Sequence, residues 1–436
     1  MSAFETLDQL YIAILSSAPR QSQLIQILCA VVHFQLTVGD IDQLFGLEEG
    51  ETRLLLRALH SVLNVPPDDK DKIFSHHASF VEFLGNLDRS SNFCVGTLDC
   101  QRSLALSLLQ FYAGPFERSE LHVFRHLISF IVSLPPSAEL FPLIGSINPE
   151  YIFDGAANLY NGELASIASW LKKSPSTPTD VIQLWEDYVF IFDLFIEGRL
   201  PKGLSVRHVV SPSPELVRVL VSLQVLFHPL EKLPATLDLT WTDLRTTLCS
   251  LRPKLVGDIH ALPICQPQAA HSWAARDLAL HLIRKMVKNH IDTKVNSVAA
   301  PHAVLLYSGH SFFSTLEAYT RSQYDLGRDI SLLVRLSPPC LVLYRELWSI
   351  PPSVIWSSRP SGYKLIHHVS KWLESFPDST MELITFWKQA ADPAPWHLSP
   401  FNTGPIFWED QWCLRVKDYN AMIARLHLPS NLRFPL

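Results

Sequence analysis

The sequence predicts a mainly α-helical protein, and three observations lead to this fold class. Apolar residues recur at helical spacing through most of the chain, for example over residues 24–31, 121–131 and 216–223. Glycine is scarce, with 16 residues in a chain of 436, which disfavours sheets punctuated by glycine turns. The 31 prolines lie mostly between the apolar runs. The chain therefore reads as separate helices joined by proline-bearing loops.

The composition is that of a compact and unusually apolar globular chain. Hydrophobic residues make up 47% and charged residues 18%, so we expect much of the chain to be buried in its own core or against a partner. The net charge of −6 comes from 36 basic and 42 acidic residues, without a basic block. This balance does not attract nucleic acid or an anionic membrane, and neither is expected as a partner.

The cysteines and the N-terminal residues indicate a cytoplasmic protein. Seven scattered cysteines without a C-x-x-C pair are typical of reduced thiols, not of a disulfide framework or a zinc ribbon. The N-terminal MSAFETLDQL has acids where a signal peptide has basic residues. The apolar run 24–34 is too short to span a bilayer.

Residues 1–36 are expected to form a short helical domain, and a helix with well-marked ends follows it. Thr37 is the predicted N-cap, with Asp40 three residues later as in a capping box. Ile41 and Leu44 form the apolar face of this short helix, and Gly46 ends it.

A second helix and a hairpin complete the pattern. Leu55, Leu59 and Val62 share one face of the predicted helix, which has acids at its N-terminal end. The run NVPPDDKDKIFSHHASF then offers two short extended segments across a polar tip, as a β-wing does. Helix, turn, helix and wing predict a winged-helix domain over residues 37–112.

After residue 112 the sequence predicts an irregular helical array. Breaker-rich joints separate its helices at residues 134–149, 173–179, 211–214 and 391–400. No signature recurs at the spacing of about 20 to 50 residues that is typical of solenoids. The expected parts are a helical domain 1–36, the winged-helix domain 37–112, and an array whose two parts cover 113–270 and 271–436.

Three stretches in the first 112 residues resemble a known protein family. They are LDQLYIAILSSA, the winged-helix run LTVGDIDQLFGLEEGETRLLLRALHSVLNVP, and HHASFVEFL. Together they resemble the region just downstream of the nucleotide-binding core in fungal NACHT-type (STAND) signalling NTPases. The similarity ends in the helix CQRSLALSLLQFY. The remaining helical array is similar to the C-terminal region of such proteins, without a motif that anchors it.

The resemblance implies one candidate nucleotide-sensing residue, His77. In that family a histidine that opens the last helix of the winged helix reaches the phosphates of bound ADP. His77 takes this position, and Glu82 takes the place of the family's later acid. The hydrophobic positions of the same pattern are occupied by Phe80, Phe83 and Leu84. Ala78 stands where the family often has aspartate, which leaves the charge network incomplete, and His76 is expected to be structural.

The residues that bind and hydrolyse a nucleotide are missing from the sequence. A phosphate-binding loop of the type G-x-x-x-x-G-K-[ST] contains a Gly-Lys dipeptide, and the sequence has none. We therefore expect a non-catalytic regulatory or interaction fragment without a cofactor of its own. ADP or ATP is expected only together with an NTPase core. The expected partner is a protein, such as a full-length NACHT-type relative.

Two alternatives concern the same region. The chain could be the C-terminal portion of a truncated gene model whose full-length protein is an NTPase switch, which translation of the DNA ahead of Met1 would reveal. A winged helix could also bind nucleic acid through basic side chains in the major groove. Residues 37–64 carry five acids against two arginines, Arg53 and Arg57, so repulsion from phosphate disfavours this reading.

A serine hydrolase is a further alternative. The run VLLYSGHSFFSTLEAY is similar to a nucleophile elbow around Ser311, and Asp329 and His367 follow in the order of triad partners. Phe313 occupies the position where the elbow needs a small residue. A role for Ser311 as a helix cap is therefore favoured.

Other histidines and the tryptophans are explained more simply by structural roles. His122 and His126 lie one helical turn apart, as zinc ligands do, but the sequence offers no third ligand and we expect no metal site. Most tryptophans lie in apolar stripes or beside prolines and are expected in the core. Those in GPIFWEDQW are also compatible with an exposed partner surface.

Overall fold

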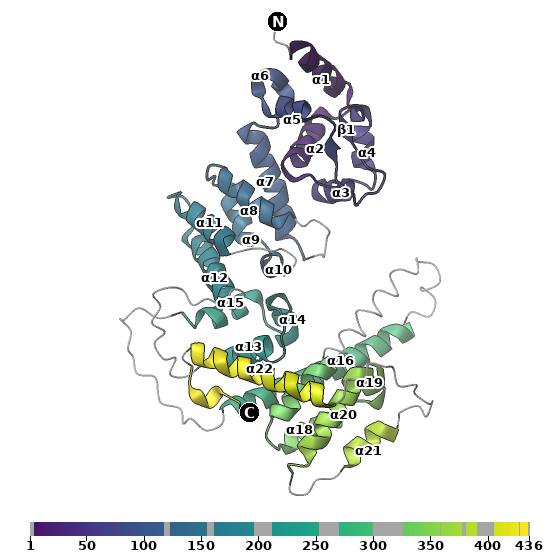
Figure 1. Ribbon diagram of the computed structural model, residues 1–436, viewed down its shortest axis with the longest axis vertical. Helices are drawn as coiled ribbons and strands as arrows, with labels where there is room; N and C mark the ends of the chain where they lie inside the picture. The colour runs from purple at the N-terminus through teal and green to yellow at the C-terminus, as the bar shows by residue number, and fades with distance from the viewer. Residues whose placement is uncertain are drawn as a thin grey trace. The chain divides into compact units, whose positions relative to one another are not determined.

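A computed structural model of the chain confirms the mainly helical fold (Figure 1). It describes residues 4–116, 123–154, 161–195, 212–252, 270–299, 326–357, 359–376, 381–389, 405–426 and 428–434. The chain divides into two compact units, Met1–Lys202 and Gly203–Leu436. We call them the first and the second unit. The boundaries expected at residues 36 and 112 fall inside the first unit, and that at 270 falls inside the second.

The first unit contains a head of short elements followed by longer helices. The head comprises α1 (Glu5–Ser17), α2 (Gln21–Phe34), α3 (Val38–Phe45), α4 (Glu51–Leu56), the 3₁₀ turn η1 (Arg57–Leu59), β1 (Leu63–Asn64), β2 (Phe74–Ser75), α5 (Ala78–Gly85), α6 (Leu87–Ser90) and η2 (Ser91–Phe93). The longer part comprises α7 (Leu98–Ala113), α8 (Phe124–Ser133), α9 (Leu140–Ser146), α10 (Pro149–Phe153), α11 (Asn161–Lys172) and α12 (Thr179–Phe195). Helix α7 packs against α2 and α9, and α11 packs against α8 and α12.

The ends of α3 follow the sequence prediction. The Thr37 hydroxyl accepts a hydrogen bond from the Asp40 amide at 3.1 Å, and the Asp40 carboxylate accepts one from the Thr37 amide at 3.1 Å. This capping box satisfies amides that the first helical turn leaves without partners. Gly46 ends the helix at a φ of +61°, a left-handed conformation that glycine adopts without a steric penalty.

The second predicted helix is shorter than its apolar face indicated. It ends at Leu56, and residues 57–59 continue as a 3₁₀ turn. Val62 is buried but not helical, because its carbonyl accepts the amide of His76 at 3.0 Å. The chain has to become extended there so that Leu63 can pair with Ser75 in the antiparallel hairpin. The prediction that Val62 belongs to the helix was therefore wrong.

The second unit is also helical in its described part. Its elements are α13 (Pro214–Gln224), η4 (Leu230–Lys232), α14 (Leu233–Leu237), α15 (Trp241–Cys249), α16 (Ala270–Ala299), α18 (Leu341–Leu347), α19 (Pro352–Ser357), α20 (Arg359–Leu373), α21 (Glu382–Gln389), α22 (Pro405–Arg425) and η5 (Ser430–Leu432). Residues 326–336 form a further helix. Helix α16 packs against α13 and α18, and α22 packs against α13.

The second unit repeats the sequence pattern of the first at a spacing much longer than that of a solenoid. The run WLKKSPSTPTDVIQLW, residues 170–185, aligns without a gap with WLESFPDSTMELITFW, residues 372–387. Upstream, LPPSAELFPLIGSINP from residue 134 aligns with SPPCLVLYRELWSIPP from residue 337. In α7 and α16 the matching stretches are RSLALSLL and RDLALHLI. The chain therefore contains a long tandem repeat, which a search for short repeats misses.

The packing of the two units follows the same correspondence. The pairs α2 and α7, α7 and α9, α11 and α12 of the first unit match α13 and α16, α16 and α18, α20 and α21 of the second. The indole N–H of Trp170 donates to the Leu134 carbonyl at 2.7 Å, and that of Trp372 donates to the Ser337 carbonyl at 2.9 Å. Both tryptophans are buried, so the same hydrogen bond ties the same two helices in each core.

The turns repeat as well. Gln35 after α2 and Phe227 after α13 have φ values of +50° and +55°, although neither is glycine. Gly46 after α3 and Asp238 after α14 have φ values of +61° and +52°. Because such values are uncommon, their recurrence at aligned positions is independent support for the repeat. Helices α3 and α4 thus correspond to the segments η4–α14 and α15.

Among the helices that the structure describes, none combines the length and the apolar character that crossing a bilayer requires.

Candidate functional site

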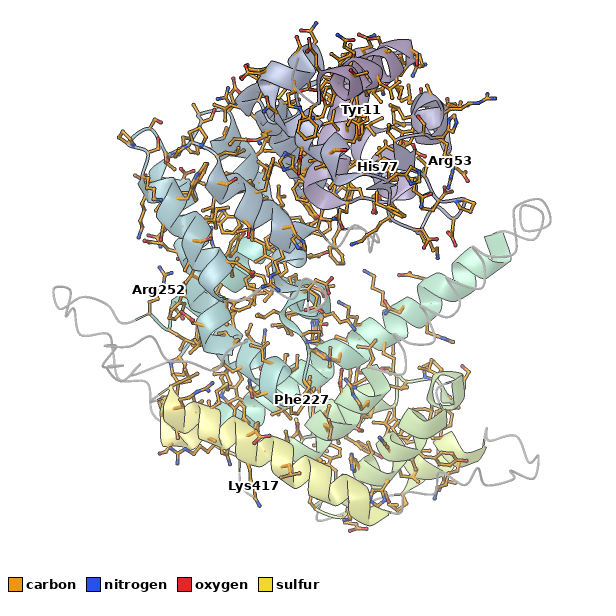
Figure 2. All side chains as sticks on the ribbon, turned by 45° about the horizontal axis from the view of Figure 1, so that its top comes forward. Tyr11, Arg53, His77, Phe227, Arg252 and Lys417 are labelled. Carbon is orange, nitrogen blue, oxygen red and sulfur yellow. The ribbon has the colours of Figure 1, made fainter. Side chains whose placement is uncertain are left out.

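The candidate residue His77 lies where the hairpin of the first unit meets helix α5 (Figure 2). It is the N-cap residue of α5, with an extended backbone at φ −134° and ψ 130°, and its exposed side chain does not cap the helix. The Ser75 hydroxyl donates to the His77 carbonyl at 2.8 Å and accepts from the His77 amide at 3.3 Å. The backbone of His77 is therefore held by the hairpin, while its imidazole faces solvent.

Helix α5 is fixed by aromatic packing against α1. Tyr11 of α1 lies with its ring centroid 5.1 Å from Phe80 and 5.2 Å from Phe83, and both phenylalanines are buried. The Tyr11 hydroxyl is 3.0 Å from the Ser79 hydroxyl in the first turn of α5. The hydrophobic positions of the expected motif thus anchor the helix start. His76 and Glu82, the other polar residues of this motif, are exposed.

An apolar groove lies beside this helix start, between α2, the hairpin and α5. Its cavity volume is about 110 Å³, and its lining residues are Leu28, Val31, Val32, Gln35, Leu63, Ile73, Phe74, Ser75, Phe80, Val81 and Leu84. Phe74 remains 50% exposed and Val81 38% exposed, so apolar surface of the groove faces solvent. No local sequence pattern marks this site, because its walls come from three separate elements.

Arg53, one of the two arginines considered for DNA binding, is engaged within the protein, whereas Arg57 is exposed. The Arg53 guanidinium donates to the carbonyls of Pro66 and Pro67 and to the Asp69 carboxylate, all in the wing (Figure 2). These bonds fix the polar tip of the hairpin against α4. Leu54 next to it is 66% exposed. The outer surface of α4 therefore presents an apolar side chain, where a DNA reader needs polar or basic ones.

Those of the other residues singled out in the sequence that the structure describes are not brought together as a site. Ser311 and His122 lie outside the described residues, and His126 is exposed on α8. Asp329, considered as a triad partner, is buried and pairs with His228 at 2.6 Å. His367 is exposed beside His368 instead.

The tryptophans divide between the two roles considered. Trp170, Trp185, Trp372 and Trp387 are buried, as expected for core residues. Trp348 is 37% exposed, and its ring centroid lies 5.4 Å from that of Phe386. The side chains of the GPIFWEDQW segment lie outside the described residues.

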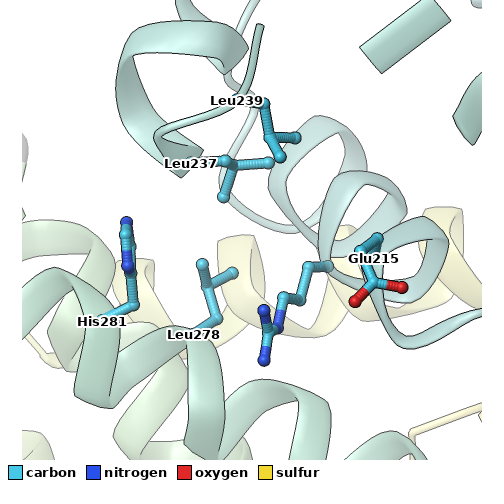
Figure 3. Close-up of a pocket in the computed structure, with 6 residues that line it drawn as sticks. Glu215, Leu237, Leu239, Leu278 and His281 are labelled. Atoms are coloured by element: carbon cyan, nitrogen blue, oxygen red, sulfur yellow. The ribbon is translucent and has the colours of Figure 1, made fainter. Parts of the chain in front are cut away.

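A small pocket in the second unit is lined by both polar and apolar side chains (Figure 3). It is lined by Glu215 and Arg218 of α13, Leu237 and Leu239 at the end of α14, and Leu278 and His281 of α16. His281 Nε2 lies 3.0 Å from the Thr236 carbonyl and 3.5 Å from the Asp238 carboxylate. The cavity volume is about 40 Å³, which holds only a few water molecules and excludes a nucleotide.

No group of three or more metal-ligating side chains occurs within the part of the chain that the structure describes. Comparisons with known proteins assign no function to these sites. No family model matches the chain, and no match to it was found among curated proteins or solved structures.

Proposed function

We propose that the chain is a non-catalytic interaction module that works in the cytoplasm, as the post-NTPase part of a NACHT-type switch does. In this proposal its partner is the nucleotide-binding core of a NACHT-type protein. The observation that carries the proposal is the apolar groove of the first unit, which is open to solvent beside His77. Exposed apolar grooves of this kind are typical of protein partners.

The order of elements supports a winged-helix assignment for residues 37–112. After α2, residues 36 and 37 bridge to the hairpin through the pairing of Thr37 with Lys72 and the hydrogen bond from the Ile73 amide to the Leu36 carbonyl at 3.0 Å. Helices α3 and α4 follow, and β1 and β2 close the wing. Two short helices followed by a two-stranded hairpin have the order expected for a winged helix, and this order supports the assignment.

The charge and shape of the groove favour a protein over a nucleic acid. Its lining is almost entirely aliphatic and aromatic, with Gln35 and Ser75 as its polar members. A partner gains free energy by inserting an apolar side chain against Phe74 and Val81, because both now face water. A phosphate backbone gains nothing comparable there.

His77 gives the proposed complex a means to respond to nucleotide. It stands before the first amides of α5, where the helix dipole favours an anion, and its imidazole is exposed. In a complex with an ADP-loaded core, the imidazole contributes one hydrogen bond to a phosphate oxygen. Without such a core the chain has no phosphate-binding loop of its own, so we propose that it binds no nucleotide alone and catalyses no reaction.

Binding of the full chain to a purified, ADP-loaded NACHT-type nucleotide-binding core tests the proposal. Isothermal titration calorimetry is expected to show a complex that Phe74→Ser weakens about tenfold, since the variant removes the exposed ring of the groove. Phe227→Ser is the matched control, because Phe227 is similarly exposed but belongs to the second unit. Equal affinities for both variants, or no binding by the unaltered chain, would refute the groove as the binding surface.

A second pair of variants isolates the nucleotide response. His77→Ala is expected to weaken binding to the ADP-loaded core and to leave binding to the empty core unchanged. His76→Ala is the control, because it removes the exposed imidazole of the residue between β2 and His77. If both variants behave alike, His77 does not sense the nucleotide.

A further inference from the structure

Two cysteines of the first unit meet across a helix interface. Cys29 lies on α2 and Cys100 on α7, and these helices pack against each other. Cys29 is fully buried and Cys100 is partly exposed. The Cys29 thiol donates to the Val95 carbonyl in the loop before α7 at 3.8 Å. About one turn away from both cysteines, the Gln26 side-chain amide of α2 donates to the Ser103 hydroxyl of α7 at 3.4 Å. These contacts hold the two helices together around Cys29 and Cys100, whose side chains interact.

The position of Cys100 favours a reactive thiolate. It is the third residue of α7, and its amide donates to the hydroxyl of the N-cap residue Thr97 at 3.3 Å. Thiols in the first turn of a helix are stabilised as thiolates by the helix dipole. The contact with Cys29 lowers the pKa of Cys100, and the same contact together with burial raises the pKa of Cys29. Cys100 is thus the accessible thiol in the first turn of a helix, and Cys29 is the buried thiol of the packed partner helix.

The second unit shows that this helix pair packs without thiols. In the aligned helices α13 and α16, Val221 takes the position of Cys29 and Ala274 takes that of Cys100. Both residues are fully buried. Packing alone is therefore satisfied by apolar side chains at these two positions, and the cysteines add chemistry that the second unit does not have.

We propose that Cys100 and Cys29 form a peroxide-reactive thiol site, with Cys100 as the attacking and Cys29 as the resolving cysteine. The Cys100 thiolate attacks hydrogen peroxide, so that its sulfur is oxidised to sulfenic acid, the O–O bond breaks and hydroxide leaves. The Cys29 sulfur then attacks the sulfenic sulfur. A disulfide forms, and the released hydroxyl takes up the Cys29 proton as water. The product links α2 covalently to α7, and a dithiol reductant reverses it.

Peptide mapping of the full chain after treatment with hydrogen peroxide tests the site. We expect a Cys29–Cys100 linked peptide that disappears on reduction. In Cys29→Val, Cys100 is expected to accumulate as sulfenic acid that dimedone labels, at least tenfold faster than it labels Cys340 or Cys249, which are also partly exposed. In Cys100→Ala, neither the link nor dimedone labelling of Cys29 is expected.

The two variants carry the residues that the second unit has at the same positions, so the α2–α7 interface keeps an apolar filling. Circular dichroism and the unfolding midpoint check that each variant is folded. Absence of the linked peptide in the unaltered chain, or labelling of Cys100 no faster than that of Cys340, would overturn the proposal.

Discussion

The two units contain the same helix pairs and the same tryptophan hydrogen bonds. They differ in the hydrogen-bond partners of their buried carboxylates. In the first unit the Asp42 carboxylate accepts the amides of Gly50 and Thr52, both at 3.0 Å, so a buried acid stabilises a turn close to it in sequence. In the second unit the Asp329 carboxylate pairs with His228, which is far from it along the chain. The first pattern secures local structure, whereas the second secures the packing of distant segments.

The aligned positions show what changed. His228 follows the left-handed residue Phe227, and the first unit has the buried Leu36 at the corresponding place. Asp329 aligns with His126, which is exposed on α8. The second unit therefore has a buried His–Asp hydrogen bond where the first has an apolar side chain and a solvated histidine. The loss of one member of such a buried polar pair leaves the other without its hydrogen-bond partner.

The largest expected effect comes from breaking that pair. Asp329→Ala removes the partner of both His228 and Arg328, which donates to the same carboxylate at 2.9 Å, and is expected to destabilise the second unit by about 3–5 kcal/mol. Hydrogen exchange measured by mass spectrometry should show faster exchange in α13 and in residues 326–336. The aligned His126→Ala in the first unit should change little. Adding His228→Leu to Asp329→Ala should recover part of the loss, and no recovery would contradict the explanation by a lost His228–Asp329 hydrogen bond.

Acid is expected to weaken the second unit through His368. Burial is the main cause that lowers its pKa to about 4 from 6.5, with the positive charge of Arg335 as the next cause. Between about pH 4 and pH 6.5 the His368 imidazole is therefore mostly protonated in the unfolded chain and mostly neutral in the folded unit. Stability is complete above pH 6.5 and falls as the pH drops to about 4, by about 3 kcal/mol. Urea unfolding across this range measures the effect, and His368→Ser, which copies the aligned Ser166, should flatten the profile.

The repeated tryptophan hydrogen bonds predict equal effects in the two units. Trp170→Phe and Trp372→Phe each leave a buried carbonyl without its donor, which costs about 1–3 kcal/mol. Unfolding of each variant, followed by hydrogen exchange in its own unit, checks this. A large loss for one and none for the other would break the correspondence between the two cores.

The smallest expected effects concern the helix caps. Thr37 and Thr240 each form a capping box, with Asp40 and with Asp243. Replacing either threonine with alanine should cost about 1 kcal/mol. Asp40 is buried and Asp243 is exposed, so Thr37→Ala should be the more costly variant in thermal unfolding. A larger loss for Thr240→Ala would show that burial does not decide the strength of these caps.

Local signals in the sequence are sufficient to predict helix α3 and both of its ends. The capping box at Thr37 and the stop at Gly46 depend on residues a few positions apart, and both are present. The end of α4 was missed because strand pairing between residues 63 and 75 overrides the helical face. The groove and the Cys29–Cys100 pair depend on contacts between distant segments, for which a single sequence carries no local mark.

The long repeat is weakly marked in the sequence. Its core positions hold similar rather than identical residues, such as Ile131 and Val334, which are both fully buried. Its loops also differ in length, so the alignment shifts between α7 and α8 relative to their counterparts. Only the common hydrogen bonds and packing pairs made the correspondence plain.

The buried hydrogen bond between His228 and Asp329 affects how a chain with two similar cores assembles. Equivalent helices of tandem repeats can exchange during folding, because their apolar surfaces fit either core. If α8 took the place of residues 326–336, His126 would stand opposite His228, and the imidazole would be buried without an acid. The correct segment offers Asp329 instead. The hydrogen bond between His228 and Asp329 therefore favours residues 326–336 over α8 at this place in the second unit. A chain assembled with α8 there is less stable, even where the apolar surfaces pack equally well.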